Sequence, residues 1–484
     1  MKGSKNSALS SSVWTIGVKF VERGLALVTY IILARFLSVE EFGVVAFALL
    51  FLEFITVLIG SGVRDYVVTR KEINDLLIDT CTYSVLIISL IISLLFYLLM
   101  DIFVGDKSQL IKDVLLVLLL LPTFSAINII QTALLQRNFK YKSLSIRGLI
   151  STTVSGLIGV YFAYQGYGAW ALVITHYCRV FINTAILQYV VRYVPRLHFS
   201  LCYFKECYRF SLPLLGSEVL NFWSSRVMEL FVSVFHGVTN LAILNIARKF
   251  TKLIQQLTLS SLRPVVLSYI SASEKQSYEF SKFVGYSTLL VSPLLVAVGI
   301  YAEFYITFIF GEQWRPAEEI VEVLSFTAIA QCLAWFFGLI LISNNKTSSV
   351  LKLNIAFTLF YLAIGAASFN VSFYTYIAIQ SIAINVISIF KIYYLVNKKY
   401  ILIKHFNALI LPSVCSSIVF AVISLLSREI IYMYSESEIE WLATALSVLF
   451  FAVTYSLTLL VSLLLFKEFQ EDVKVIFKKI KTSS

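Results

Sequence analysis

The sequence has few charged residues and no motif for nucleotide or metal chemistry. Charged residues make up 14% of the 484 positions and hydrophobic residues 59%, whereas about 25% of a typical soluble domain is charged. No GxxxxGK[ST] sequence is present, which excludes an ATP-hydrolysing loop of that type. The six cysteines show no metal-ligand spacing, and the four histidines are scattered. This composition excludes a soluble enzyme, a disulfide-rich secreted protein and a disordered protein, and we expect no cofactor and no metal site.

Apolar windows long enough to cross a bilayer recur along the whole chain. A spanning helix needs roughly 20 mostly apolar residues, whereas a membrane β-barrel uses shorter segments of alternating hydrophobicity. The windows are 13–36, 43–62, 82–103, 114–135, 149–166, 169–191, 211–235, 240–262, 283–306, 319–341, 353–370, 375–396, 408–427 and 441–466. Because these runs do not alternate, the sequence predicts an all-α, multi-pass membrane protein with about 14 transmembrane helices.

Lysines and arginines are unevenly distributed between the segments that connect these windows. With the N-terminus inside, 27 of them fall on the cytoplasmic side, and only Lys107, Lys112, Arg315 and Arg428 fall in outer loops. Cytoplasmic loops of membrane proteins carry such an excess. We therefore predict that both termini are cytoplasmic. The net charge of +11 then reflects membrane topology, and we expect no nucleic-acid partner.

The first two spans resemble spans 7 and 8, because a charge-bearing helix is joined in each pair through a very short outer turn to a second helix. Internal repeats with a binding site at their interface are common in transporters. We therefore expect two six-helix lobes around a central cavity, at residues 1–205 and 206–400. Two further helices and a basic cytoplasmic tail would follow at residues 401–484.

Several charged residues fall inside the predicted spans, where a charge near the bilayer centre costs about 2.5–3.5 kcal/mol. Those on the first span lie at positions i, i+3 and i+4 and so share one helix face, and those on the eighth form a polar stripe. The candidate ligand-binding cations are Lys19, Arg23, Arg179, Arg226, Arg248 and Lys252, and the candidate charge partners or coupling groups are Glu22, Glu218 and Glu229. Glu53 has no evident partner in the sequence.

Two interpretations of these buried charges stay open. In the first, the charges pair and hold helices together, as Glu22 with Arg23 or Arg226 with Glu229. In the second, spans 1, 7 and 8 line a water-filled cationic cavity. Because the cations in the predicted spans outnumber the acids, pairing alone leaves a positive surplus. We therefore hypothesise a cavity that holds an anionic head group.

Four short stretches resemble the polysaccharide exporter and flippase family within the multidrug/oligosaccharidyl-lipid/polysaccharide superfamily. The stretches are LARFLSVEEFG at 33–43, GVRDYVVTRK at 62–71, LRPV at 262–265 and FGEQWRPA at 310–317. Two departures stand out, because Val39 occupies a position where the family has proline, and Arg64 and Asp65 occupy positions where small residues are usual. The order of the four stretches along the chain matches the family.

The resemblance implies a flippase that moves an undecaprenyl-pyrophosphate-linked oligosaccharide from the inner to the outer leaflet of the bacterial cytoplasmic membrane by alternating access. Arginine and lysine are natural partners of a pyrophosphate. A polysaccharide polymerase and the chain-length machinery are expected partners, and the coupling ion, H⁺ or Na⁺, stays open. Two alternatives also remain: a flippase for the peptidoglycan lipid precursor, and a cation-coupled multidrug antiporter, which would call for surplus buried acids.

Overall fold

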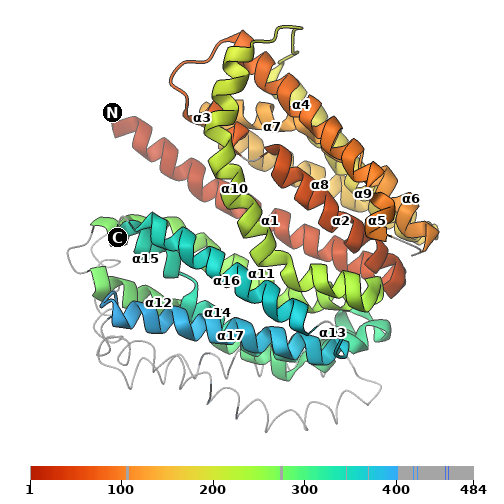
Figure 1. The fold of residues 1–484 in the computed structure, drawn as a ribbon, viewed down its shortest axis with the longest axis vertical. Coiled ribbons are helices and arrows are strands. Elements are labelled where there is room, and N and C mark those ends of the chain that lie inside the picture. The colour runs from red at the N-terminus through yellow and green to blue at the C-terminus, as the bar shows by residue number, and fades with distance from the viewer. Residues whose placement is uncertain are drawn as a thin grey trace. The chain divides into compact units, whose positions relative to one another are not determined.

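The protein is built from α-helices, and no strand occurs among the residues that the structure describes (Figure 1). The computed structural model describes residues 2–60, 62–104, 108–272, 276–344, 346–368 and 370–401, together with the single positions 418, 422, 453 and 456. Ten helical stretches of this described part are long and apolar enough to cross a membrane. The prediction of an all-α, multi-pass membrane protein is therefore confirmed.

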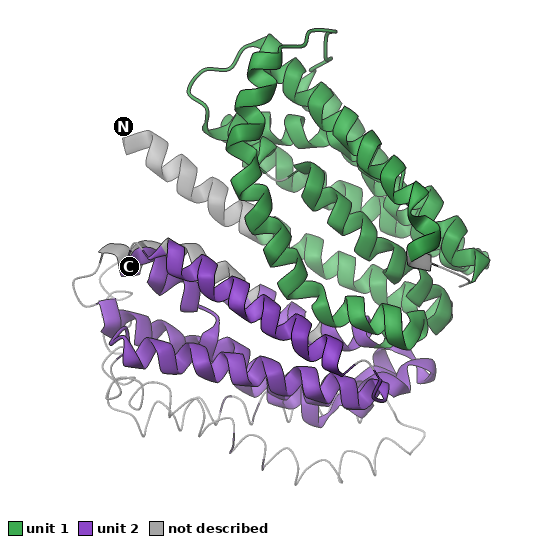
Figure 2. Ribbon diagram, viewed as in Figure 1, with its two compact units in different colours: residues 1–243 green, residues 244–484 purple. Residues whose placement is uncertain are grey.

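The chain divides into two compact units, residues 1–243 and 244–484 (Figure 2). The helices of the first unit are α1 (Lys2–Phe36), α2 (Val39–Gly60), α3 (Val63–Thr69), α4 (Asp75–Leu98), α5 (Met100–Val104), α6 (Gln109–Leu118), α7 (Leu121–Arg137), α8 (Tyr141–Tyr164), α9 (Ala169–Val191), α10 (Leu201–Phe231) and the π-helical turn η1 (Val232–His236). Within it α8 packs against α1 and α9, α7 packs against α4 and α9, and α10 packs against α2, α3 and α4.

The second unit begins inside α11 (Gly237–Ala272). Its other described helices are α12 (Gln276–Ile300), α13 (Ala302–Phe310), the 3₁₀ turn η2 (Glu312–Ala317), α14 (Glu318–Ala334), α15 (Phe337–Ser343), α16 (Thr347–Ala367) and α17 (Phe373–Asn397). α14 packs between α12 and α17, and α16 packs against α15 and α17.

Helices lie over twelve of the fourteen predicted windows. The last two windows, 408–427 and 441–466, and the basic tail lie outside the described residues apart from the single positions, so the total number of spans stays a prediction. The predicted lobe boundary after residue 205 falls within α10, whereas the first compact unit includes all of α10 and ends at Ile243.

Several predicted windows, among them 114–135, contain two helices. α6 ends at Leu118, and α7 begins at Leu121 with Pro122 in its first turn. Proline has no backbone N–H, so it is favoured in the first turn of a helix and weakens a helix interior. The break at Leu119 and Leu120 therefore follows from Pro122. In contrast, α10 continues through Pro213.

The junction of α1 and α2 carries the first of the four resembling stretches. The Ser38 Oγ and backbone N donate to Glu41 Oε2 at 2.9 and 2.8 Å, and the Glu41 backbone N donates to Ser38 Oγ. This is a capping box, which satisfies backbone donors at the start of α2. At Gly43, five residues after Ser38, a Cβ atom would overlap the Val238 carbonyl oxygen. The glycine therefore allows α2 to approach the start of α11 closely.

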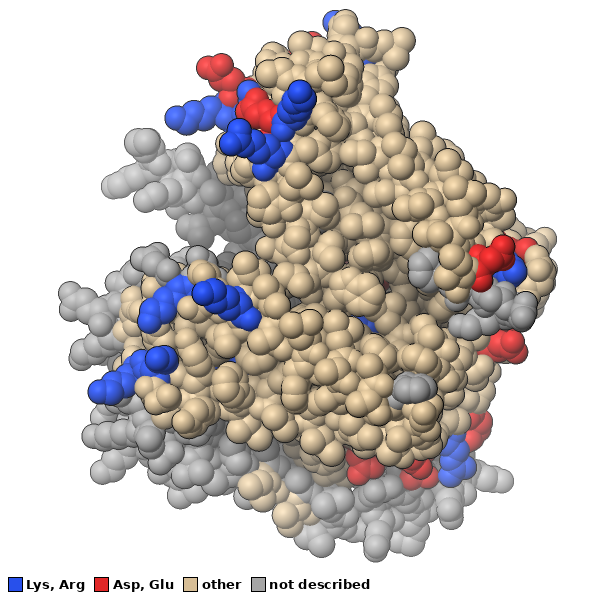
Figure 3. Space-filling model, viewed as in Figure 1, with Lys and Arg blue, Asp and Glu red and all other residues tan. Residues whose placement is uncertain are grey.

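Charged side chains of unit 1 gather at the ends of its helices on the face shown in Figure 3, and the surface between them carries almost no charge. At one end, Asp79 near the start of α4 is buried, with 1% of its surface exposed. Its Oδ1 accepts hydrogen bonds from the Tyr193 hydroxyl and the Arg196 backbone N, and its Oδ2 lies 3.3 Å from His198 Nδ1. This carboxylate therefore fastens the segment between α9 and α10 to α4.

Candidate functional site

Arg226 on α10 forms two ion pairs inside unit 1. Its Nη2 lies 2.5 Å from Glu53 Oε2 on α2, and its Nη1 lies 3.1 Å from Glu229 Oε1, three residues along α10. The Glu229 side chain is fully buried, whereas half of the Glu53 side chain is exposed. Arg226 and Glu229 therefore form the pair that their spacing suggests, and Arg226 is also the partner of Glu53 that the sequence does not reveal.

A cavity of about 530 Å³, here called the polar cavity, lies beside these ion pairs between α2, α9 and α10. Its lining combines the carboxylates of Glu53 and Glu218 and the Arg226 guanidinium with an imidazole, an amide and two hydroxyls. The lining residues are Leu49, Leu52, Glu53, Thr56, Val57, His176, Glu218, Asn221, Phe222, Ser225 and Arg226. Such a surface can donate and accept many hydrogen bonds, as a hydroxyl-rich ligand requires.

A second group of charges, here called the Glu22 cluster, joins α1, α8 and α9. The Glu22 carboxylate acts electrostatically on the guanidinium groups of Arg147 and Arg179. It also lies against Gly148, where a Cβ atom would be 2.7 Å from Oε2. Arg147 Nη1 donates to Thr132 Oγ1 of α7 at 2.9 Å. The cluster brings two cations to one acid.

Two donors of the Glu22 cluster are buried without an acceptor. The Nε atoms of Arg147 and Arg179 make no hydrogen bond within the described structure. A buried donor without a partner is costly, by roughly 1–3 kcal/mol and more when the group is charged. The Nε donors of the two arginines can therefore bind acceptor oxygens of a ligand, and hydrogen bonds from guanidinium groups are strongest to anionic oxygens.

The remaining predicted residues of unit 1 differ in exposure. Lys19 is exposed on α1, and Arg23 is half-buried four residues further along the same helix. Glu218 is exposed on α10 and lines the polar cavity.

The other two predicted cations lie in unit 2. Arg248 and Lys252 are half-buried on α11, and the sequence of α11 contains no aspartate or glutamate. Gln255, at the end of the predicted polar stripe, is buried and donates to Gln331 Oε1 of α14 at 3.2 Å. The convergence of Arg248 and Lys252 with Arg226 in one cavity stays a prediction.

Several residues of these sites are absent from the predicted set, among them His176 and Arg147. His176 lines the polar cavity, but no carboxylate lies near it in the sequence. Arg147 is counted among the cytoplasmic cations by the sequence prediction, yet it lies in the second turn of α8, a helix able to cross the membrane. The sequence feature that could have indicated this position is that Arg147 lies only two residues before the apolar window 149–166.

A family model and two relatives match the sequence. The model described as "Polysaccharide biosynthesis protein" matches residues 32–319. The succinoglycan biosynthesis transport protein ExoT of Rhizobium meliloti (strain 1021) is 27% identical over 321 residues, which are 64% of each chain. The lipopolysaccharide biosynthesis protein WzxC of Escherichia coli (strain K12) is 21% identical over 375 residues, which are 74% of each chain. The match thus spans slightly less than two thirds of the length of ExoT.

Solved structures share the fold at low sequence identity. The lipid II flippase MurJ in an inward closed conformation superposes with a TM-score of 0.75 at 16% identity, covering 93% of this chain and 99% of that one. An inward-facing multidrug resistance MATE family transporter of the MOP superfamily gives a TM-score of 0.55 at 14% identity, covering 78% of this chain and 94% of that one. Because the family model covers more than half of the sequence, this multi-pass membrane protein belongs to the polysaccharide biosynthesis protein family.

Proposed function

We propose that the protein is a flippase for a polysaccharide precursor, a polyprenyl-pyrophosphate-linked oligosaccharide. It moves this lipid from the inner to the outer leaflet of the bacterial cytoplasmic membrane by alternating access, and it catalyses no chemical reaction. The family match and the names of ExoT, WzxC and MurJ support a transporter of this class. Such a lipid combines an anionic pyrophosphate, a hydroxyl-rich glycan and an apolar tail.

The observation that carries the proposal is the pair of unsatisfied guanidinium donors in the Glu22 cluster. Arg147 and Arg179 place two positive charges near one carboxylate, and their Nε donors are buried without acceptors in the described structure. A pyrophosphate supplies both the negative charge and several acceptor oxygens, which arginine binds in its planar fork geometry. Lys19, Arg23, Arg226, Arg248 and Lys252 are the further cations that we assign to the path of the pyrophosphate.

The polar cavity suits the head group of the same substrate, the pyrophosphate at Arg226 and the sugars that follow it. Hydroxyl groups both donate and accept hydrogen bonds, and Thr56, Asn221 and Ser225 offer both functions beside the Glu53–Arg226 pair. Glu22, Glu218 and Glu229 then serve as charge partners or as sites of coupling to H⁺ or Na⁺. The polymerase that uses the flipped lipid and the chain-length machinery are the partners that this function implies.

Complementation of a strain that lacks its own polysaccharide-precursor flippase tests the proposal. The wild-type chain should restore surface polysaccharide, and R147Q and R179Q should each reduce it at least about tenfold, the effect of about 1.4 kcal/mol lost from substrate binding. Arg64, which is half-exposed beside Asp65, provides the matched control, and R64Q should retain full activity. Protein levels in the membrane are measured for each variant.

Three results contradict the proposal. Full activity of both R147Q and R179Q would remove its structural basis. Rescue of a strain that lacks its peptidoglycan-precursor flippase, without rescue of the polysaccharide strain, would favour that function. Drug resistance without polysaccharide would favour an antiporter.

A further inference from the structure

A second pocket of unit 1, here called the aromatic pocket, lies between α2, α4 and α10 with η1. It has a volume of about 380 Å³, and eight of its twelve lining residues are phenylalanine or tryptophan. The lining residues are Phe47, Leu50, Phe51, Phe54, Phe96, Phe222, Trp223, Leu230, Phe231, Ser233, Val234 and Phe235. The hydroxyl of Ser233, the one polar residue among them, donates to the Leu230 carbonyl oxygen at 2.7 Å. The pocket therefore suits an apolar ligand.

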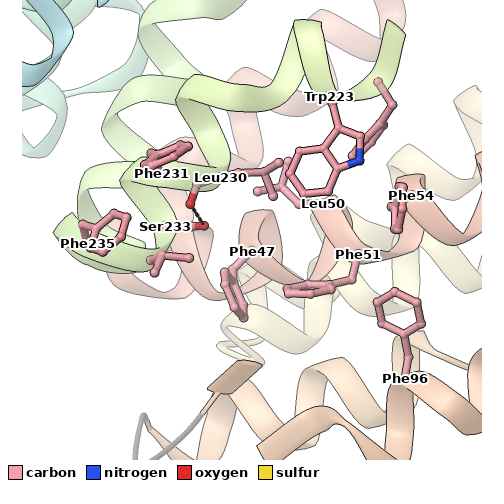
Figure 4. Close-up of a pocket in the computed structure, with 12 residues that line it drawn as sticks. Phe47, Leu50, Phe51, Phe54, Phe96, Trp223, Leu230, Phe231, Ser233 and Phe235 are labelled. Atoms are coloured by element: carbon pink, nitrogen blue, oxygen red, sulfur yellow. Dashed lines mark hydrogen bonds between the residues drawn. The ribbon is translucent and has the colours of Figure 1, made fainter. Parts of the chain in front are cut away.

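The aromatic rings of three helices fix one another in this pocket (Figure 4). The Phe54 centroid lies 5.1 Å from that of Phe222, 6.0 Å from that of Trp223 and 6.3 Å from that of Phe96, and Phe51 lies 6.0 Å from Phe96. These separations are typical of favourable ring pairs. The pocket wall is therefore preformed.

The aromatic pocket and the polar cavity share one wall. Phe222 lines both, and α2 and α10 contribute to both. On α2 the neighbours Glu53 and Phe54 face the two different spaces, and on α10 Phe222 lies one turn before Arg226. A ligand that places a polar group in the polar cavity can therefore extend an apolar chain along this wall into the aromatic pocket.

We propose that the aromatic pocket binds the isoprenoid chain of the carrier lipid, in the units nearest the pyrophosphate. This inference rests on the proposed function, which supplies the polyprenyl carrier. At roughly 30 Å³ per heavy atom, the share of a molecule in liquid water, the pocket holds on the order of a dozen carbon atoms, or two to three five-carbon units. An unsaturated, methyl-branched chain presents double bonds and C–H groups to the ring faces, whereas a straight acyl chain presents mainly methylene groups.

The position of the pocket along α2 gives its depth in the bilayer. Phe47 lies eight residues from the start of α2, about 12 Å along the helix axis, and Phe54 lies seven residues further. With the predicted cytoplasmic N-terminus, α2 starts at the outer side of the membrane. Residues 47–54 then lie about 12–22 Å from the outer side of a hydrocarbon core about 30 Å thick, so the pocket straddles the middle of the bilayer.

Photocrosslinking of the full-length protein tests this site. The protein is reconstituted into phosphatidylethanolamine and phosphatidylglycerol nanodiscs with undecaprenyl pyrophosphate that carries a diazirine near its pyrophosphate. A straight-chain alkyl pyrophosphate with the diazirine at the same distance serves as the comparison probe. We expect label on residues 47–54 and 222–235, at least about fivefold stronger for the isoprenoid probe because its unsaturated units contact several rings.

Two variants and a control separate this site from general lipid contact. F54L removes the central ring but keeps an apolar side chain, and L230W fills the space. Each should reduce the pocket label at least about fivefold. F124A removes an exposed ring of α7 outside the pocket and should leave the label unchanged. Equal labelling by the straight-chain probe, or loss of the label in excess phospholipid, would show ordinary bilayer lipid and overturn the proposal.

The photocrosslinking and complementation experiments together test the tail site and the proposed function separately. If the wild-type chain restores surface polysaccharide but the isoprenoid probe labels other segments, the tail site is wrong and the flippase function stands. If the chain fails to restore polysaccharide but the probe labels the pocket in the wild type and not in L230W, the site stands and the function is wrong.

Discussion

Arg226 contacts two carboxylates whose surroundings differ, and each contact contributes differently to stability. The Glu229 side chain is fully buried, whereas 48% of the Glu53 side chain is exposed. Exposed ion pairs contribute about 0–1 kcal/mol, but removing one member of a buried pair costs about 3–5 kcal/mol because an uncompensated charge remains.

We therefore expect R226Q to destabilise the protein by about 3–5 kcal/mol and E53Q by about 1 kcal/mol or less. Chemical unfolding of the detergent-purified protein measures both free energies. The double variant R226Q/E229Q should recover much of the loss, because the buried charge is then absent. Equal effects of R226Q and E53Q would contradict this account of the two contacts.

Gly43 ends the first resembling stretch, and its role is steric. A Cβ atom there would overlap the Val238 carbonyl oxygen, so G43A should destabilise the protein by about 1–3 kcal/mol, as overpacking does. Gly216 on α10 has no atom within 4 Å of its Cβ position. The matched variant G216A should stabilise the helix by about 0.5–1 kcal/mol. Thermal unfolding checks both, and a neutral G43A would argue against close packing at this point.

At the scale of elements, single side chains near the ends of α4 and α7 form hydrogen bonds to neighbouring segments. Arg137 at the end of α7 donates to the backbone carbonyls of Val67, Val68, Arg70 and Lys71, which satisfies the last carbonyls of α3. Arg70 in turn pairs with Glu206 of α10. Burial lowers and the Glu206 hydrogen bond raises the pKa of Arg70, and the balance is a pKa above its ordinary value.

Asp79 has the same fastening role for residues 192–200. Burial, followed by the hydrogen bond to Asp79, raises the pKa of the Tyr193 hydroxyl above its ordinary value, so Tyr193 stays a donor at neutral pH. D79N removes the charge that strengthens these hydrogen bonds, each worth about 1.5–3 kcal/mol. Amide hydrogen exchange in 192–200 should accelerate at least about tenfold. D75N, at an exposed position of α4, is the control, and unchanged exchange in D79N would contradict the role.

The sequence predicts helices well because apolar length is a local property. It does not predict where α6 ends and α7 begins, although Pro122 is the cause, because mean apolar content stays high across the break. It also predicts the i, i+3 pair of Arg226 with Glu229. The Glu53–Arg226 pair, which joins positions 173 apart, has no local periodicity and depends on how α2 and α10 pack.

At the scale of the whole molecule, the buried cations fall into two groups. The unit 1 residue Arg226 pairs with two acids, Glu53 and Glu229. Arg147 and Arg179 share one acid and retain buried Nε donors in the described structure. An excess of positive charge within the spans could be predicted from the sequence. That Arg147 and Arg179 lie together at Glu22 depends on how α1, α8 and α9 pack.

Translocation by the purified full-length protein in liposomes tests the central claim most directly. A lipid-linked oligosaccharide is placed in both leaflets, and its exposure to an external glycan-modifying enzyme is followed over time. We predict that wild-type protein exposes the inner pool, that R64Q does the same, and that R147Q and R179Q slow the exposure at least about tenfold, a loss of about 1.4 kcal/mol. An inner pool that stays protected with the wild type, or equal rates for all four proteins, would contradict the account.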